Sequence, residues 1–507
     1  MTIPENPCFI VFDLGSQSLR ASVFDSHGYK YYVPSRAVNT QVKGNKIEQD
    51  PWQWWNSSVE LFRYLTNNDW VKRRLAGIGY IGTGYGVIAI GKDGEPLSKA
   101  ITYYDARAEE ESVTISNSEN FKKLSERYGY TSSRTNILEK ILWIKNNEPE
   151  VYDSTRVFLD PTGYFFFKAT GEAAIDRISA SKLYANPYGD YPLELLAELG
   201  IDPSKLPKVV NSVMFKGELK NSVAEEVGIG NVPVIYLAHD SNCALLGSGV
   251  TEKGILLDNS GTGTSLKVFV KSEEGVEGHP VDFPILPGKA FFSSYVRNTG
   301  IMLEGYRRRL LSGGFPGLND HLNEQHDTPY IVDPSYTSPS YALEDFELEK
   351  IVLYESANLE NSREVILKRK KGRGSIEYGD LKDNNEFTRA VAESLAFPVR
   401  RYIEELKDSG VTIDKIVASG GISRHDGIAQ IKADVVGLPV YKILDETTSL
   451  GGAIMVAAGT GLYENVEEAA RNMVWPGKFF EPNEMTPGLE DRYASYIKLV
   501  DAIPASS

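Results

Sequence analysis

Two glycine-rich turns, about half a chain apart, have the composition of anion-binding sites. Each follows a short apolar run, at residues 9–12 and 255–257, and leads into a strand of alternating apolar and polar side chains. Small residues let backbone N–H groups approach an anion closely, and hydroxyl groups add further donors. The residues concerned are Asp13, Gly15, Ser16 and Ser18 in the first turn and Gly261, Thr262, Gly263 and Thr264 in the second. The pair predicts phosphate binding, and Asp13 could organise a hydrated Mg²⁺ ion.

Either turn alone is equally typical of an ordinary hairpin, in which glycine supplies a positive φ. What favours phosphate binding is the repetition. Both turns occur in the same context, at the starts of two halves of the chain. A protein built in this way can hold one polyphosphate with backbone donors from both halves.

The elements around these turns alternate between strands and helices. Their apolar runs predict buried strands at residues 9–12, 78–82, 234–238, 255–257 and 416–418, and a hairpin at residues 87–95. Asp50 would cap a helix that begins at Pro51, and further helices are predicted at residues 108–128, 137–148, 192–199, 241–246 and 386–407. A third glycine turn follows at residues 419–424. This order is typical of a mixed α/β fold.

Composition limits the classes of protein and partner. A chain of 507 residues is too long for one hydrophobic core, so two domains are expected. A net charge of −15 disfavours nucleic acid and anionic membrane as partners, and the irregular segment 315–385, with its basic run, does not change this. We find no apolar stretch of membrane-spanning length and no signal peptide. Two distant cysteines, Cys8 and Cys243, favour a reducing compartment, which we expect to be the cytoplasm. The sequence is compatible with a homodimer.

Four blocks of sequence, in order, resemble the FGGY family of carbohydrate kinases, which belongs to the actin-like ATPase fold class. Residues 13–20 resemble the family's first phosphate motif and residues 259–264 the second. Residues 418–424, with Gln430 and residues 433–440, resemble its adenosine motif, and residues 447–453 its C-terminal Gly/Ala signature. The resemblance implies two actin-like (ribonuclease H-like) α/β domains, residues 1–249 and 250–507, with the active site in the cleft between them.

The resemblance also implies that the cofactors are ATP and Mg²⁺. Asp13 would organise the metal, and the glycines of the third turn would let the nucleotide lie flat against the backbone. The residues expected to bind the nucleotide are Asp13, Gly15, Ser16, Gln17, Ser18, Arg20, Gly261, Thr262, Gly263, Gly420, Gly421, Ser423 and Arg424.

Asp240 is the expected general base, because a sugar hydroxyl must lose its proton as it attacks a phosphoryl group. It follows a buried strand and begins a helix, and the family's catalytic aspartate occupies the matching position. The alternative is that Asp240 only caps the helix that follows. His239, beside it, is expected to be structural.

The sugar side of the site is less distinctive in the sequence. Tyr85 could stack on the C–H face of a sugar or be a packed loop residue, and Asp105 could bind substrate or form a structural charge pair with Arg107. The candidates are Gly84, Tyr85, Asp105, Asp240 and Ser241, with Asn136 and Lys140 added by position only.

We therefore predict an ATP-dependent kinase that phosphorylates a ketose or a sugar alcohol. The loop at residues 83–86 lacks the patterns of glycerol kinases and xylulokinases, so neither substrate is carried over. Two alternatives are a sugar-sensing relative without catalysis and an actin-fold ATPase that drives a conformational change. The presence of both Asp13 and Asp240 weighs against the first alternative, and the resemblance at residues 433–440 weighs against the second.

Overall fold

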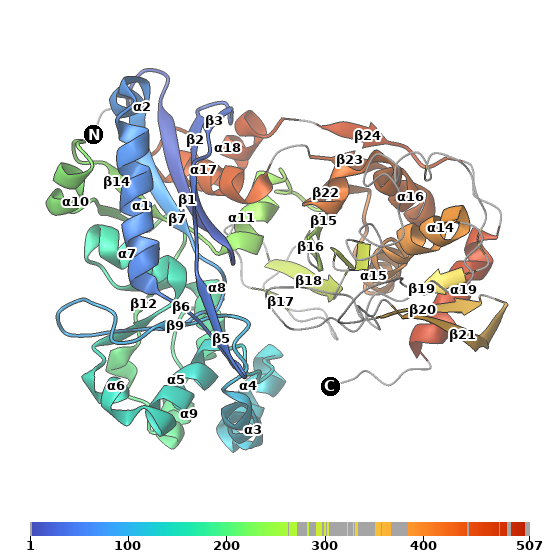
Figure 1. Ribbon diagram of the computed structural model, residues 1–507, viewed down its shortest axis with the longest axis horizontal. Helices are drawn as coiled ribbons and strands as arrows, with labels where there is room; N and C mark the ends of the chain where they lie inside the picture. Colours follow the sequence, from blue (N-terminus) through green and yellow to red (C-terminus); the bar gives the residue numbers. More distant parts are fainter. Residues whose placement is uncertain are drawn as a thin grey trace, which may run out of the picture. The chain divides into compact units, whose positions relative to one another are not determined.

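The structure is a computed structural model that describes residues 3–261, 263–270, 281–282, 290–296, 299–300, 302–303, 322, 328, 330–332, 350–355, 357–366, 384–443, 446–475, 477–483 and 488–501. The chain divides into two units, each with its own β-sheet (Figure 1). The first unit comprises Met1–Thr251, Lys271–Phe291 and Glu446–Trp475, and the second Glu252–Val270, Phe292–Asp445 and Pro476–Ser507. Residues 446–475, which lie beyond the expected boundary at 249/250, thus pack with the first unit.

The first apolar run forms the centre of the sheet in the first unit. Its strand, β1 (Cys8–Leu14), is buried along its whole length, as expected of a central strand. The strand order is β13-β14-β7-β1-β2-β3, and β4 also pairs with β2. The other strands are β2 (Ser18–Asp25), β3 (Lys30–Tyr32), β4 (Ser35–Ala37), β7 (Leu75–Ile81), β13 (Lys216–Glu218) and β14 (Pro233–Tyr236). β1 runs antiparallel to β2 and parallel to β7, and β7 runs parallel to β14.

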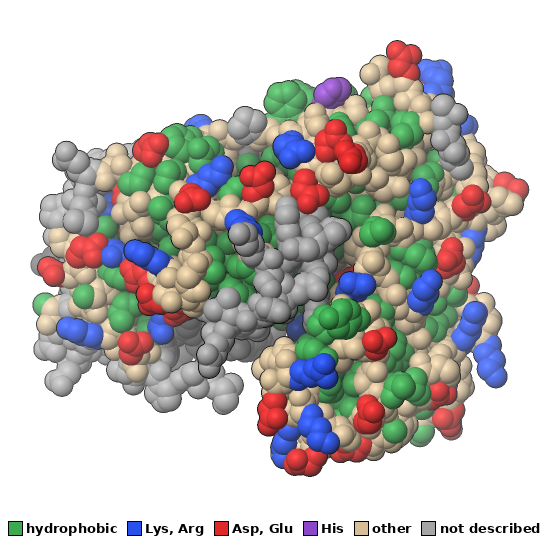
Figure 2. Space-filling view, turned by 180° about the vertical axis from the view of Figure 1, so that it is seen from behind, with side chains coloured by type: hydrophobic (Ala, Val, Ile, Leu, Met, Phe, Trp, Pro, Cys, Tyr) green, Lys and Arg blue, Asp and Glu red, His purple; other side chains and the backbone are tan. Residues whose placement is uncertain are grey.

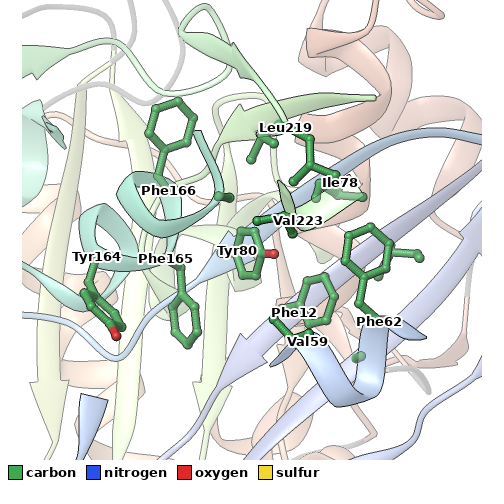
Figure 3. Close-up of a cluster of buried hydrophobic side chains, with 14 of the residues drawn as sticks. Phe12, Val59, Phe62, Ile78, Tyr80, Tyr164, Phe165, Phe166, Leu219 and Val223 are labelled. Atoms are coloured by element: carbon green, nitrogen blue, oxygen red, sulfur yellow. The ribbon is translucent and has the colours of Figure 1, made fainter. Parts of the chain in front are cut away.

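Aromatic side chains fill the core on one face of this sheet (Figure 3). Phe12 of β1 stacks on Tyr80 of β7 with ring centroids 4.7 Å apart, and Tyr80 stacks on Phe165 of α7 (Pro161–Thr170) at 5.2 Å. Phe62 of α1 (Pro51–Thr66) meets the ring of Phe12 edge-on at 5.5 Å. The predicted start of α1 is confirmed, since the Asp50 side chain accepts the N–H of Trp52 and Pro51 begins the helix.

The remaining elements of the first unit form small sheets and a helical region. Three short sheets contain β5 (Thr40–Lys43), β6 (Lys46–Gln49) and β9 (Ala100–Ile101); β8 (Ile88–Ile90) and β10 (Val157–Leu159); and β11 (Ala174–Asp176) and β12 (Lys208–Val210). The helices are α2 (Asp69–Arg74), α3 (Glu109–Asn117), α4 (Glu119–Tyr128), α5 (Ile137–Asn147), α6 (Pro149–Ser154), α8 (Arg177–Ala180), α9 (Leu193–Leu199), α10 (Asn221–Glu226), α11 (Asp240–Gly247), α17 (Thr447–Gly459) and α18 (Val466–Met473).

The other seven-stranded sheet repeats the arrangement of the first. Its order is β17-β18-β16-β15-β22-β23-β24. The strands are β15 (Ile255–Ser260), β16 (Thr264–Val270), β17 (Val281–Asp282), β18 (Ala290–Val296), β22 (Lys415–Ser419), β23 (Val440–Lys442) and β24 (Lys478–Phe480). β15 is antiparallel to β16 and parallel to β22, β22 is parallel to β23, and β24 is antiparallel to β23. The order β16-β15-β22-β23-β24 in this sheet corresponds to the order β2-β1-β7-β14-β13 in the first sheet, and neighbouring strands run in the same relative directions. The duplication predicted for the turns therefore extends to the sheets.

One predicted helix of the second unit is divided in two. The pattern at residues 386–407 predicts a single helix, but the structure has α14 (Asn384–Ser394) and α15 (Phe397–Asp408). Pro398 lies in the first turn of α15, and proline lacks the N–H that a continuous helix would need there. The unit also contains α16 (Asp426–Val436), α19 (Leu489–Asp501) and the sheet of β19 (Tyr330–Val332), β20 (Lys350–Glu355) and β21 (Asn358–Ile366).

Charged side chains of both signs are mixed over the face drawn in Figure 2. Among the residues that the structure describes, we find no helix with the length and apolar character of a membrane span. Cys8 and Cys243 are both buried free thiols.

Candidate active site

The first phosphate turn is held by an ion pair at its base. Asp13 and Arg20 lie opposite each other in the β1–β2 ladder, and the Arg20 guanidinium donates to Asp13 Oδ2 at 2.5 Å. The pKa of Asp13 is raised to about 7, chiefly by burial and in smaller part by the nearby carboxylates of Glu446 and Asp240, against the attraction of Arg20. Arg20, expected to bind nucleotide, is thus the partner of Asp13 in this structure.

The tip of the same turn is exposed, while its backbone is bonded within the protein. Gly15 N–H donates to the carbonyl of Ser18 at 2.9 Å, and the Gln49 side chain donates to the carbonyl of Ser16 at 3.0 Å. Ser16 and Gln17 are exposed. These bonds hold the backbone of the turn, and the side chains at its tip remain exposed to solvent.

The second phosphate turn has a similar internal bond. Gly261 N–H donates to the carbonyl of Gly263 at 2.8 Å, and Thr262 lies outside the described residues. The expectation that the Thr264 hydroxyl faces an anion is wrong. This hydroxyl is buried and bonds Ser260 at 3.0 Å and Thr299 at 2.9 Å, because β16 directs it into the core.

A buried ion pair that the sequence analysis missed lies under the second turn. Lys432 of α16 pairs with Asp258 of β15 and also donates to Ser260 Oγ at 3.0 Å. Both charged side chains are almost fully buried, and Ser260 in turn donates to Asp258. A lysine among the apolar residues of a helix and an aspartate that ends an apolar strand were the available signals. The pair ties the phosphate turn to the helix that follows the adenosine turn.

The third glycine turn packs directly on the second. Gly420 has φ +87°, and a Cβ there would lie 2.5 Å from the carbonyl oxygen of Ser260. Both the backbone angle and the close approach therefore require glycine. A Cβ on Gly421 would meet no atom within 4 Å. Ser423 donates to the carbonyl of Gly420 at 2.7 Å and closes the turn, whereas Arg424 is exposed.

Asp240 is the first residue of α11, four residues after β14 ends at Tyr236. Its side chain is 45% exposed, and Oδ1 accepts the N–H of Ser241 at 2.6 Å. The N-cap position belongs to His239, whose side chain makes no capping bond. Asp240 therefore lies in the first turn and not at the N-cap position, and its role as general base stays a prediction.

The Gly/Ala signature packs against the helix that carries Asp240. A Cβ on Gly451 of α17 would lie 1.7 Å from the carbonyl oxygen of Cys243 in α11, and one on Gly247 of α11 would lie 1.9 Å from that of Thr447. The backbones of the two helices are thus in direct contact. On the sheet side, a Cβ on Gly452 would meet the side chain of Val11 at 2.7 Å. These glycines set the height of α11 above the sheet.

Tyr85 lies beside His239 in a strained conformation. Its φ is +63°, and its ring lies 5.4 Å from that of His239 and 5.8 Å from that of Tyr103. The Lys182 ammonium lies 5.1 Å from the centroid of the Tyr85 ring. A Cβ on the preceding Gly84 would also contact the His239 ring, at 3.8 Å.

Two further residues near this loop bear on the sugar side. Lys140 is fully buried and donates to the carbonyl of Tyr85 at 2.7 Å, and burial lowers the pKa of Lys140 to about 7. It therefore holds the loop. Tyr104, which the sequence analysis did not select, is 54% exposed with its ring 5.3 Å from that of Tyr103. Partial burial raises the pKa of its hydroxyl, and the charges of Tyr103 and Asp240 contribute to the rise.

Asp105 is held inside the protein. Its carboxylate accepts two bonds from the Arg107 guanidinium, at 2.8 and 2.7 Å, the backbone N–H of Arg107 at 3.0 Å and the N–H of Ile47 at 2.5 Å, and it is 1% exposed. Arg107 is also paired with Glu48 at 2.7 Å. The charge-pair alternative describes this arrangement, and substrate binding by Asp105 stays a prediction.

Comparison with known proteins identifies the same family in both halves of the chain. Residues 8–247 match the N-terminal domain of the FGGY family of carbohydrate kinases, and residues 318–460 match the C-terminal domain. The xylulose kinase of Staphylococcus xylosus is 25% identical over 456 residues, covering 89% of this chain and 90% of that protein. The L-fuculokinase of Escherichia coli K12 is 23% identical over 493 residues, covering 95% of this chain and 98% of that protein.

Solved structures show the same fold. A ligand-bound xylulose kinase from Lactobacillus acidophilus superposes with a TM-score of 0.82 at 20% identity, over 99% of both chains. A glycerol kinase from Plasmodium falciparum with ADP superposes with a TM-score of 0.81 at 17% identity, over 100% of both chains.

Proposed function

The chain belongs to the FGGY family of carbohydrate kinases and is a phosphotransferase with an alcohol group as acceptor; from this premise we propose that it transfers the γ-phosphoryl group of ATP to a hydroxyl of a ketose or sugar alcohol, with Asp240 as general base. In this reaction the Asp240 carboxylate takes the proton of the acceptor hydroxyl. The acceptor oxygen forms a bond to the γ-phosphorus, the bond to the bridging oxygen breaks, and ADP leaves.

The observation that carries this proposal is the position of Asp240. Its carboxylate is half-exposed at the first turn of α11, where Oδ1 lies 3.3 Å from Nδ1 of His239, and the ring of Tyr85 packs against the ring of His239. Aromatic rings pack well on the C–H faces of sugars. A base that can be reached by solvent, beside aromatic side chains, suits the deprotonation of a sugar hydroxyl.

We propose that ATP is bound by residues of both units. The first turn would supply Gly15, Ser16, Gln17, Ser18 and Arg20, and the second unit Gly261, Thr262, Gly263, Gly420, Gly421, Ser423 and Arg424. The support is that the third turn packs on the second through Gly420 and Ser260, so adenosine and phosphate contacts would share one rigid base.

Asp13 fits a role in holding Mg²⁺. Its carboxylate is buried with those of Glu446 and Asp240 nearby, and together they exceed the charge of Arg20, so a divalent cation would relieve the repulsion. Within the described residues no three acidic, histidine or cysteine side chains form a direct metal cage, which suits an ion held mainly by phosphates and water. When bound, Mg²⁺ neutralises charge on the transferred phosphoryl group.

The acceptor class rests on the relatives. Those of known name include xylulose kinases and L-fuculokinases, and the matching structures include a glycerol kinase. A ketose or a polyol is therefore proposed here. The free thiols and the use of ATP fit the cytoplasm, and the homodimer stays a prediction.

The test is a coupled assay of ADP release over a panel of ketoses, aldoses and polyols. We expect one class of acceptor to give turnover, and Asp240→Asn to lose at least about 100-fold in kcat while binding ATP as the wild type does. Asp69→Asn, on the surface of α2, is the control and should behave as wild type.

Each failure has a distinct signature. An Asp240→Asn variant with full activity would refute the role of Asp240. ADP release that no acceptor stimulates would favour an ATPase, and sugar binding without turnover would favour a sensing protein.

A further inference from the structure

The His239 ring is bonded on both of its nitrogens. Nε2 lies 3.0 Å from the Asn242 side-chain amide nitrogen and 3.4 Å from the Tyr85 hydroxyl. Nδ1 lies 3.3 Å from Asp240 Oδ1 and 3.3 Å from Ser241 Oγ. The ring is 5% exposed. It therefore lies between the loop of Tyr85 and the carboxylate of Asp240, buried and with a partner on every side.

The partners determine where the proton of the ring lies. An ionised carboxylate only accepts hydrogen bonds, so Nδ1 must carry a proton toward Asp240. The Asn242 amide nitrogen only donates, so Nε2 must accept. The two requirements come from different residues and agree on the neutral imidazole with its proton on Nδ1. A tyrosine hydroxyl can donate to Nε2 as well.

We propose that His239 is a positioning residue that aims the general base and links it to the sugar loop; this rests on the proposed function of Asp240. Two hydrogen bonds to Asp240, from His239 Nδ1–H and from Ser241 N–H, end on Oδ1. They fix the rotation of the carboxylate and hence the direction of Oδ2, which receives the proton. The 3.3 Å separation is long, and catalytic hydrogen bonds shorten when substrate is bound.

The link to Tyr85 gives the arrangement a role in substrate use. Lys140 holds the Tyr85 carbonyl, and the Tyr85 hydroxyl lies within 3.4 Å of the ring that orients the base. A sugar that orders Tyr85 would therefore also order Asp240. The base would be best aligned when the acceptor is in place.

Two amide substitutions separate the two sides of the ring. In His239→Asn, the amide nitrogen can take the place of Nδ1 and keep the bond to Asp240. In His239→Gln, the amide reaches the place of Nε2 and the bond to Asp240 is lost. Because a base misplaced by about 1 Å costs about 100-fold, we expect kcat to fall about 10- to 100-fold in His239→Gln and His239→Phe, and less than about threefold in His239→Asn.

Further readouts exclude a merely structural effect. KM for ATP should not change in any of the variants, and Tyr85→Phe, which keeps the ring and removes the hydroxyl, should lower kcat more weakly than His239→Gln. In the wild type, long-range ¹H–¹⁵N spectra of the imidazoles, of which the chain has six, should show His239 protonated on Nδ1 alone. The signal is assigned by its loss in His239→Asn.

The results that would overturn the role of His239 differ from those that would overturn the proposed function. Equal kcat values in His239→Asn and His239→Gln, full activity in His239→Phe, or a ring protonated on Nε2 would overturn it. If the wild type phosphorylates no acceptor, the proposed function fails and the spectra alone decide the tautomer. If the wild type is active and His239→Phe is too, only the inference about His239 fails.

Discussion

Replacing Gly451 by alanine should misplace the general base without touching it. The new Cβ would lie 1.7 Å from the carbonyl oxygen of Cys243, whereas real Cβ contacts are essentially never below 3.0 Å. Since the obstacle is backbone, α11 and α17 must separate by more than about 1 Å, and a shift of this size costs about 100-fold when it displaces a reacting group. Asp240 begins α11, so we expect kcat to fall by about that factor.

The stability of the variant should fall less than its activity. Overpacking costs about 1–3 kcal/mol, and alanine gains up to about 1 kcal/mol over glycine in a helix, so we expect a net loss of about 1–2 kcal/mol. Urea unfolding measures this loss, and the ADP-release assay with the acceptor found in the screen measures kcat.

Gly459→Ala in the same helix is the matched control. Its nearest neighbours would be side-chain atoms of Ile235 in β14, at 2.7–3.0 Å, rather than the backbone of α11. We expect near wild-type kcat for this variant. A Gly451→Ala enzyme with wild-type kcat and stability would refute the claim that direct contact between the two helices positions Asp240.

Three other predictions concern stability and nucleotide binding. Gly420→Ala should lower the free energy of unfolding by about 1–3 kcal/mol and weaken ATP binding, because φ is +87° and the new Cβ would strike the backbone of Ser260. Gly421→Ala should weaken ATP binding alone, because its Cβ would meet no atom within 4 Å. Calorimetric titration measures the binding and urea unfolding the stability, and equal stabilities of the two variants would contradict this prediction. Burial raises the pKa of Asp160 from 3.8 to about 7, so the protonated carboxyl contributes its full stabilisation below pH 4, and this stabilisation is lost as pH rises to 7. Between pH 4 and 8, the free energy of unfolding of Asp160→Asn should therefore gain up to about 4 kcal/mol relative to that of the wild type. A difference between the two proteins that does not depend on pH would refute this prediction. Glu393→Ala should lower the free energy of unfolding in urea by about 3–5 kcal/mol, because it removes the carboxylate partner of the buried Arg389 and Arg492 side chains. Arg401→Ala, which removes a more exposed ion pair with Glu405, should lower it by less than about 1 kcal/mol. Similar losses in the two variants would argue against a special role for the buried ion pairs of Glu393.

The local elements of both sheets were accessible from the sequence. The run at residues 9–12 and the alternation of Leu19, Ala21 and Val23 predicted the first hairpin, and the structure buries all of these side chains. Asp50 and Pro51 predicted the start of α1. Such signals are local, because strand alternation and helix capping depend on neighbours a few residues away. Pro398 also indicates a break, although the pattern of apolar residues continues across it.

The sequence predicted which turns and which acidic residue belong to the candidate site, but not which side chains contact one another there. The sequence located Asp240 and the three glycine turns, and the family confirmed the class of reaction. It did not show that Arg20 pairs with Asp13, that Thr264 faces the core, or that Tyr104 lies near the base. Each of these depends on the direction of a side chain once strands and helices have packed.

What the sequence by itself determined is the duplicated α/β arrangement, the glycine turns and the kinase family, since all three are written in local patterns and their order. Only the tertiary structure decided the partners of the charged and close-packed groups. Lys432 pairs with Asp258, Gly451 packs on Cys243, and His239 contacts Tyr85. In each pair the two residues are far apart in the sequence. The reason is physical: local propensity depends on adjacent residues, whereas these contacts follow from how whole elements pack to fill the core.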